Sequence, residues 1–240
     1  MIELRRPAGE FARVGHRGAS ALAPENTPAA FELAVELGCD MLEFDVLGVE
    51  DGRVVVAHDR RRAAAAQPVT LDEALAFCAE HLPGIGLQVD LKRRGVEAAV
   101  VQALRRHGVL ERSWVSGFDA VSLRRVADLA PELPRSYTLP RDRFGISKRG
   151  PLAPVARAAL ASIGASLPRR LPVLLARARA AAATLHHSVA SAAAIARAHE
   201  LGAAVYVWTV DDSGLAETFI RRGADGIITN DPRIFATLKT

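Results

Sequence analysis

The feature that most constrains this chain is an alternation of short apolar segments with helical patterns along most of its 240 residues. The short segments are rich in β-branched residues, and the stretches between them carry apolar residues at helical spacing and often end at a glycine. About eight such strand–helix units favour a parallel barrel, for which a chain of about 250 residues is typical. We expect strands at residues 13–16, 41–46, 54–57, 86–90, 114–116, 136–139, 184–186, 203–209 and 226–229.

The helical patterns complete the expected fold, a single TIM (β/α)8 barrel domain over residues 1–240. Thr27-Pro28 supplies a capping residue followed by proline at the first helical position, and Gly38 closes that helix. An open doubly wound sheet is the alternative, but it usually has a glycine-rich loop after its first strand, and GHRGA is not one. Further helices are expected at 71–78, 96–107, 121–129, 191–201 and 215–222, from 232 onward, and as two helices within 148–187 that are separated near Leu167-Pro168.

The charge of the chain is modest and spread out. Half of the residues are hydrophobic, which is enough for a sizeable core, and the formal net charge is +4. The arginines are scattered among alanines, which indicates solvated helix faces and lacks the clustered stripe of a nucleic-acid-binding protein. We therefore expect no nucleic-acid partner, but a mild attraction for anionic substrates.

The cysteines and the hydropathy of the chain indicate in which cellular compartment the protein is expected. Cys39 and Cys78 lack the paired spacing of a zinc site or a redox motif, so we expect buried free thiols in a reducing environment. Residues 1–11 are interrupted by charges and do not resemble a signal peptide. Arginines also interrupt the alanine-rich stretch 151–183, so no transmembrane segment is expected. These patterns favour a cytoplasmic enzyme and leave the oligomeric state open.

Polar residues recur where the expected strands end. In a parallel barrel the carboxyl ends of all strands open onto one face, so polar side chains at those ends gather into one site. The residues that fulfil this condition are His16-Arg17, Glu43 with Asp45, His58-Asp59, Asp90 with Lys92, and Trp208-Thr209.

The segment Glu43-Phe44-Asp45 has the period of a strand, so both carboxylates point to one side and Phe44 to the other. Two like charges held so close are unfavourable unless a proton or a cation intervenes. A hard divalent ion bound by oxygen atoms relieves the repulsion, with Asp90 as a third ligand. The alternative is a pair of surface carboxylates that form salt bridges with arginines, but the apolar neighbours mark this as a core strand.

Two histidines and two cations accompany the carboxylates. A lone histidine at a strand end is more often structural, whereas His16 and His58 on one rim with carboxylates suit general acid and base catalysis. Arg17 and Lys92 would bind an anionic group, one as a planar fork and one as a point charge. The set describes attack on a phosphoryl centre and protonation of a leaving alkoxide.

These residues stand in an ordered set of motifs that resembles the glycerophosphodiester phosphodiesterase family. A single His-Arg-Gly run would be weak, but many elements in the right order make the resemblance specific. It covers both ends of the chain, while residues 148–183 contribute nothing to it. The elements are His16-Arg17-Gly18, Pro24-Glu25-Asn26-Thr27, Phe31, Gly38, Glu43-Phe44-Asp45-Val46, Asp51-Gly52, His58-Asp59, Asp90-Leu91-Lys92, Trp208-Thr209-Val210 and Gly223-Ala224-Asp225-Gly226-Ile227-Ile228-Thr229.

The resemblance implies a TIM barrel that hydrolyses small glycerophosphodiesters to glycerol 3-phosphate and an alcohol, usually with calcium or magnesium. Glu25 would lie close to the metal, and Asn26 beside it in the same motif, although capping of the following helix would also explain both. The remaining implied roles are His16 and His58 as acid and base, Glu43, Asp45 and Asp90 as metal ligands, Arg17 and Lys92 as phosphate contacts, and Trp208 as an aromatic wall.

The chain also departs from the family pattern. Asp90 stands where glutamate is usual and is one methylene shorter. Asn230 stands where aspartate is common, a change for which we expect no effect on the chemistry. The link 60–70 is short, whereas many members have a long insertion there that covers the substrate. An open mouth could admit bulkier head groups or a lysophospholipid.

Other functions remain as alternatives. A phospholipase D-like hydrolase of lysophospholipids could use the same barrel. A zinc amidohydrolase fits less well because it usually has a His-x-His pair at the first strand, and the adjacent His186-His187 is expected to be a rim or core pair. A catalytically inactive barrel that serves as a binding module is also conceivable, but such barrels tend to lose a histidine or a metal carboxylate first.

Overall fold

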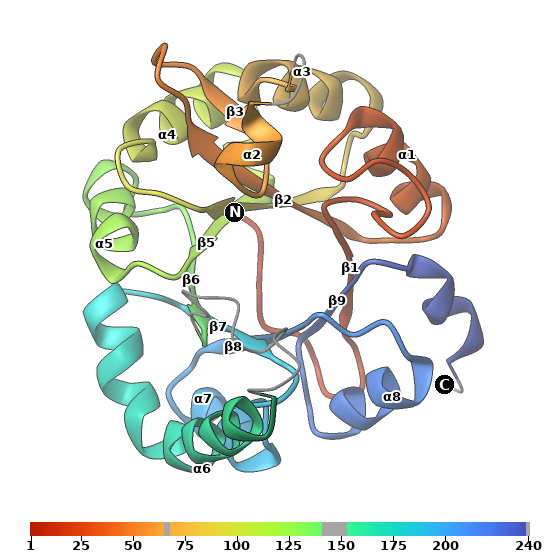
Figure 1. Ribbon diagram of the computed structural model, residues 1–240, viewed down its shortest axis with the longest axis vertical. Coiled ribbons are helices and arrows are strands. Elements are labelled where there is room, and N and C mark those ends of the chain that lie inside the picture. Colours follow the sequence, from red (N-terminus) through yellow and green to blue (C-terminus); the bar gives the residue numbers. More distant parts are fainter. Residues whose placement is uncertain (65–67, 141–152, 239–240) are drawn as a thin grey trace.

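The expected barrel is confirmed in the computed structural model, which describes residues 1–64, 68–140 and 153–238. Among these residues, eight parallel strands form a closed ring, because the first strand pairs with both the second and the last. Figure 1 shows the ring with the helices outside it. The barrel strands are β1 (Ala12–His16), β2 (Met41–Gly48), β4 (Gly86–Leu91), β5 (Ser113–Gly117), β6 (Arg135–Leu139), β7 (Ala182–His186), β8 (Ala204–Trp208) and β9 (Gly226–Thr229).

The helices begin where the sequence supplies capping residues. Thr27 accepts a hydrogen bond from the backbone N–H of Ala30, and Thr70 forms a reciprocal capping box with Glu73. The last segment, expected as a helix, is a 3₁₀ helix at Pro232–Thr237. The α-helices are α1 (Pro28–Glu36), α2 (Arg60–Ala63), α3 (Leu71–His81), α4 (Glu97–Arg106), α5 (Ala120–Leu129), α6 (Ala153–Ala178), α7 (Ala192–Glu200) and α8 (Ser213–Arg221), with a 3₁₀ turn at Leu110–Arg112.

No helix in the described part of the chain is long and apolar enough to cross a membrane.

The apolar segment expected at 54–57 is a strand, but it lies outside the ring. It forms β3 (Val54–Val56), which pairs antiparallel with the end of β2 so that Val56 lies opposite Val46. The chain therefore runs along β2 past the carboxyl end of the barrel and turns back along β3. The backbone N–H of Ala57 donates to the carbonyl of Asp45 at 3.0 Å. This hairpin returns the chain to the level of the barrel mouth just before His58.

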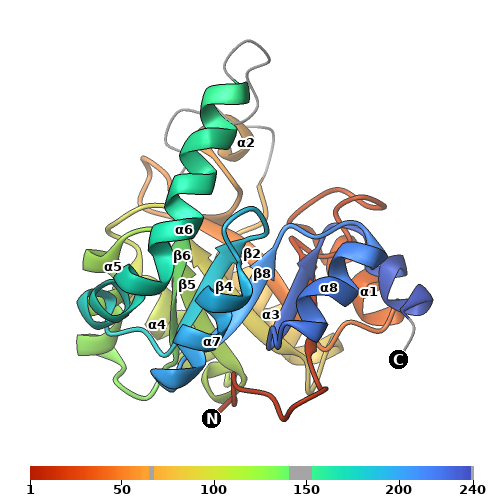
Figure 2. The same cartoon turned by 90° about the horizontal axis from the view of Figure 1, so that it is seen from below.

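The expectation of two helices near Leu167-Pro168 is wrong. A single helix of 26 residues, α6, continues through Pro168 and Pro172. Each proline removes a backbone donor and normally costs about 3 kcal/mol or more inside a helix. Leu167, Leu171 and Leu175 are nevertheless buried at spacings of four, within the core shared with α7 and β7. Packing thus outweighs the local preference to break. The helix α6 extends past the end of the barrel at which α2 also lies, on the opposite side of the ring (Figures 1 and 2). Residues 148–152 of that expectation lie outside the described residues.

The amino-terminal end of the barrel is filled by apolar side chains. Trp114 and Tyr206 are fully buried there, with ring centroids 4.7 Å apart, and the Tyr206 hydroxyl donates to the carbonyl of Leu4. Gly226 makes room for this layer, since a Cβ atom at that position would lie 2.3 Å from the Tyr206 ring. The base is therefore closed, and polar residues collect at the opposite end.

Candidate active site

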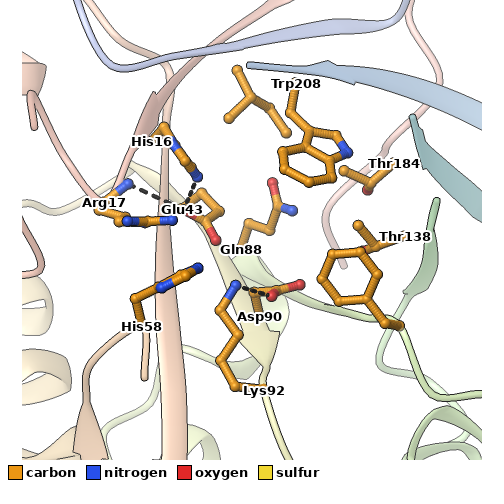
Figure 3. Close-up of a pocket in the computed structure, with 12 residues that line it drawn as sticks. His16, Arg17, Glu43, His58, Gln88, Asp90, Lys92, Thr138, Thr184 and Trp208 are labelled. Carbon is orange, nitrogen blue, oxygen red and sulfur yellow. Dashed lines mark hydrogen bonds and ion pairs between the residues drawn. The ribbon is translucent and has the colours of Figure 1, made fainter. Parts of the chain in front are cut away.

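A small pocket opens among the carboxyl ends of the strands. Its volume is about 60 Å³. Seven of the predicted site residues line it, from segments that are far apart in the sequence (Figure 3). The lining consists of His16, Arg17, Glu43, His58, Gln88, Asp90, Lys92, Phe118, Thr138, Thr184, Trp208 and Ile228.

Three carboxylates gather at one side of this pocket. Glu43, Asp45 and Asp90 are all buried, and one oxygen atom from each lies within 4.8 Å of the others. The period-two prediction for β2 is borne out, because Phe44 points away from them and packs against Phe31 with ring centroids 5.6 Å apart. The strand thus separates a charged inner face from an apolar outer face.

Two cations partly neutralise the carboxylates. Lys92 Nζ lies 2.5 Å from Asp45 Oδ1 and 2.6 Å from Asp90 Oδ2, and Arg17 Nε lies 2.8 Å from Asp45 Oδ2. Burial alone would raise the pKa of Asp45, but Lys92 and Arg17 outweigh it and hold the pKa well below its usual range. Burial, followed by the charge of Asp45, raises the pKa of Glu43 well above its usual range.

This donor set fits a hard divalent cation. All three candidate ligands are carboxylates, and such ions prefer oxygen atoms. The three carboxylates are accompanied by two cations, Arg17 and Lys92, so a further positive charge would be favourable beside them. Ser116 Oγ donates to Asp90 Oδ1 at 2.5 Å and so helps to hold the shorter aspartate in place.

His16 is held by the side-chain amide of the residue that follows the last barrel strand. Its Nδ1 lies 2.6 Å from Oδ1 of Asn230, and the Asn230 amide nitrogen donates to Asp211 at 2.7 Å. Because Asp211 fixes the amide orientation, His16 must carry its proton on Nδ1, which leaves Nε2 facing Glu43 at 3.8 Å. Burial, followed by the charge of Arg17, lowers the pKa of His16 to about 4. Asn230, which stands where aspartate is common in the family, is therefore in direct contact with His16, and the expectation that this change has no effect on the chemistry stays a prediction.

His58 follows the β3 hairpin and is held more loosely. Its Nδ1 lies 3.3 Å from Asp59 Oδ2, and Asp59 also accepts from the backbone N–H of Arg62 at the start of α2. Burial is the largest influence on His58 and lowers its pKa. The two imidazoles thus approach the pocket from different elements.

Glu25 and Asn26 contact the site and leave helix capping to Thr27. Glu25 Oε2 accepts from Arg17 Nη1 at 2.7 Å. The Asn26 amide donates to Asp45 Oδ2 and accepts from the Asp45 backbone N–H, both at 3.1 Å. These contacts favour a role in the site over the capping alternative.

Arg62 is a residue that the sequence did not single out. Its Nε lies 2.5 Å from Glu25 Oε1, and its Nη1 donates to Asp59 Oδ2 at 2.7 Å. Glu25 contacts Arg17, and Asp59 contacts His58. One arginine from the short link after β3 therefore connects the residues that flank both sides of the pocket.

The sequence analysis also did not single out several uncharged residues that line the pocket. Gln88 precedes Asp90 by two positions on β4, so a period-two reading of that strand would have placed both on the inner face. Thr138 and Thr184 occupy equivalent inward positions at the ends of β6 and β7, where their register pairs them. The expected pair His186-His187 lies at the rim, and the His186 ring contacts Trp208 edge-on at 5.2 Å.

Comparison with known proteins agrees with this geometry. The sequence model of the glycerophosphoryl diester phosphodiesterase family matches residues 16–73 and 70–234. The chain belongs to the glycerophosphoryl diester phosphodiesterase family. It is thus an enzyme of the class that hydrolyses glycerophosphodiesters, as the resemblance implied.

Relatives of this phosphodiesterase match over nearly its whole length. A glycerophosphodiester phosphodiesterase of Caldanaerobacter subterraneus is 28% identical over 260 residues, which is 94% of this chain and 96% of that protein. A phosphodiesterase of Oleispira antarctica, solved with the product sn-glycerol-3-phosphate, superposes with a TM-score of 0.73 at 23% identity and covers 94% of this chain and 95% of its own. A glycerophosphodiester phosphodiesterase of Agrobacterium tumefaciens superposes with a TM-score of 0.71 at 23% identity, over 95% of this chain and 100% of that one.

Proposed function

We propose that this enzyme hydrolyses glycerophosphodiesters to glycerol 3-phosphate and an alcohol, with a divalent cation and with His16 and His58 as base and acid. The observation that carries the proposal is the convergence on one pocket of two imidazoles, two cations and a cluster of three buried carboxylates, two of which line the pocket. The product seen in the Oleispira antarctica phosphodiesterase is sn-glycerol-3-phosphate, which supports the same product here.

The assignment of His16 as base rests on its tautomer and its charge. The hydrogen bond to Asn230 holds the proton on Nδ1, so the lone pair of Nε2 is available to accept a proton. A pKa of about 4 keeps the imidazole neutral at ordinary pH. A cation bound by the carboxylates would lower this pKa further, since it adds positive charge nearby.

His58 is the complementary acid. Asp45 and Asp59 favour its protonated form, although burial outweighs them in the free enzyme. A bound phosphodiester brings negative charge to the pocket, which raises the pKa of a neighbouring imidazole. The protonated His58 can then give its proton to the departing alkoxide.

The charged residues bind the phosphate group. Arg17 and Lys92 face the pocket and are poised to contact phosphoryl oxygens, one as a bidentate donor and one as a point charge. Glu43, Asp45 and Asp90 would hold calcium or magnesium, and a bound ion supplies Lewis-acid neutralisation of the phosphoryl charge. The nucleophile is water or the neighbouring hydroxyl of the substrate's own glycerol, which would give a cyclic phosphate first.

We further propose a cytoplasmic location. Cys39 and Cys78 are buried free thiols, which is the state expected in a reducing compartment.

The decisive experiment measures turnover of a panel of glycerophosphodiesters by chelated protein to which calcium, magnesium or manganese is returned. We expect release of glycerol 3-phosphate that needs the metal, and loss of turnover in His16→Ala and His58→Ala without unfolding. Retained activity in both variants would overturn the histidine assignment. Choline release from lysophosphatidylcholine, compared with glycerophosphocholine, tests the phospholipase D-like alternative.

A further inference from the structure

Lys92 contacts two of the three carboxylates that the proposed function assigns to a divalent ion. Its Nζ lies 2.5 Å from Asp45 Oδ1 and 2.6 Å from Asp90 Oδ2, within ion-pair distance of both. Figure 3 shows the ammonium group directed at Asp90. The two aspartates are buried, and an unpaired buried carboxylate is costly, so this lysine is a main source of their neutralisation.

The second oxygen of each aspartate is held by another side chain. Asp90 Oδ1 accepts from Ser116 Oγ at 2.5 Å. Asp45 Oδ2 contacts Arg17 Nε at 2.8 Å and accepts from the Asn26 amide at 3.1 Å. The oxygens that remain for an ion are therefore Asp45 Oδ1 and Asp90 Oδ2, and the ammonium group contacts both of them.

The contact of Lys92 with Asp45 is an ion pair and not a hydrogen bond. Asp45 Oδ1 is buried and accepts no hydrogen bond within the part of the chain that the structure describes, although Nζ is 2.5 Å away. Buried oxygens are seldom left in this condition. Oxygen coordination to a metal ion such as calcium is less directional than a hydrogen bond, so the same oxygen is suited to be a ligand.

Lys92 and a divalent ion cannot hold the same two oxygens, because like charges repel strongly in a buried site. The lysine stem is flexible and its ammonium is a compact charge, so Lys92 is the partner that can move. The ring centre of Phe118, which lines the same pocket, lies 5.9 Å from Nζ and offers the displaced ammonium a cation–π contact.

The charges of the site favour the same order of events. With a divalent ion bound, the three carboxylates face four positive charges, of which Arg17 and Lys92 supply two. The negative charge of a phosphodiester balances the fourth. The ammonium group that the ion displaces is therefore expected to contact the substrate.

We propose that Lys92 is an internal counter-ion, which holds the divalent-ion position in the metal-free enzyme and is displaced towards the phosphate when the ion binds. This inference rests on the proposed function, because it takes the carboxylate cluster as the ion site. It makes ion binding a condition for the contact between Lys92 and the substrate, so that an enzyme without its ion binds the phosphodiester weakly.

Lys92→Met tests the proposal, because it removes the charge and keeps the length of the stem. Calorimetry measures the binding of calcium to chelated protein without substrate. Wild type must break the charged hydrogen bond between Lys92 and Asp90 to bind the ion, whereas the variant need not. We therefore expect Lys92→Met to bind calcium at least about 10-fold more tightly than wild type. Without calcium the variant should lose thermal stability, and saturating calcium should restore it.

Arg17→Met is the matched control. Arg17 carries the same charge, contacts the same Asp45, and has a side chain that is 14% exposed against 15% for Lys92. The oxygen that it holds is not one that we assign to the ion, so Arg17→Met should tighten calcium binding by less than about 3-fold. Equal tightening in the two variants would show that only the nearby positive charge matters, and would overturn the proposal. Unchanged or weaker binding by Lys92→Met would do the same.

A measurement on wild type covers the case in which Lys92→Met does not fold. The chain has three lysines, Lys92, Lys148 and Lys239, so NMR of protein with isotope-labelled lysine side chains gives few signals. The Lys92 signal, identified by its loss in Lys92→Arg, should shift when calcium is added. A Lys92 signal that stays unchanged at saturating calcium would overturn the proposal and leave the ion site intact. If wild type binds neither calcium nor magnesium, the metal dependence in the proposed function fails as well, so the two failures are distinguishable.

Discussion

Asn230 and His16 are 214 positions apart in the chain, yet their side chains form a hydrogen bond of 2.6 Å. The bond leaves the imidazole nitrogen nearest the carboxylates free of a proton. Because the asparagine amide is itself held by Asp211, the orientation of His16 depends on two residues that do not line the pocket.

Replacement of Asn230 by Asp should change the pH dependence of catalysis. A carboxylate beside His16 favours the imidazolium and raises its pKa above the present value of about 4. A base is active when it is deprotonated, so activity falls as pH drops through this pKa. The acid limb of the kcat/KM profile should therefore move to higher pH. Asn230→Leu should lower kcat on the order of 10-fold with little change in KM, because the tautomer is no longer fixed. An acid limb that stays in place in Asn230→Asp would contradict the role of His16.

Arg62 should act on catalysis without contacting the substrate. Arg62→Ala releases both Glu25 and Asp59, which hold Arg17 and His58. We expect kcat/KM to fall by about 3- to 5-fold, because Arg62 is half exposed and each of its two ion pairs is worth at most about 1 kcal/mol in solvent. Arg61→Ala, an exposed neighbour on the same short helix, is the control and should stay within about 2-fold of wild type. Equal losses in the two variants would show that only the general charge of the segment matters.

The carboxylate cluster should bind a divalent ion with graded losses on substitution. Glu43→Gln and Asp90→Asn should each weaken calcium or magnesium binding about 10- to 100-fold, because each removes an anionic oxygen ligand. Titration of chelated protein by calorimetry measures this directly. Glu97→Gln provides the comparison, since Glu97 is a buried glutamate that bonds Ser122 in another part of the fold. If it weakens metal binding equally, the ion is held elsewhere.

The rim histidine His186 should make stability depend on pH. Burial, followed by the charge of His187, lowers the pKa of His186 to about 4. An unfolded chain has a histidine pKa of about 6.5, so it binds more protons than the folded chain between these values. Stability from this group is complete above about pH 6.5 and is lost as the pH falls towards 4. The Tm of His186→Phe should therefore vary less between pH 7 and pH 4.5 than the Tm of wild type. Parallel curves for the two proteins would exclude this origin.

Local periodicity was enough to predict much of the barrel and part of the site. The alternation in Glu43-Phe44-Asp45 is a property of three adjacent residues, and the structure has the same alternation. The continuous helix through Pro168 could not be foreseen, because the packing that maintains it comes from α7 and β7. Asp211 and Asn230 likewise acquire their contacts only when the ring closes.

The β3 hairpin places one histidine of the proposed acid–base pair outside the barrel strands. His58 follows β3, a strand that pairs antiparallel with β2 and is not one of the parallel strands of the ring. The segment that follows can therefore lengthen or shorten without shifting the register of any barrel strand. The substrate range can therefore change through insertions in the link after His58, because a longer segment there could cover the pocket without disturbing the fold of the barrel.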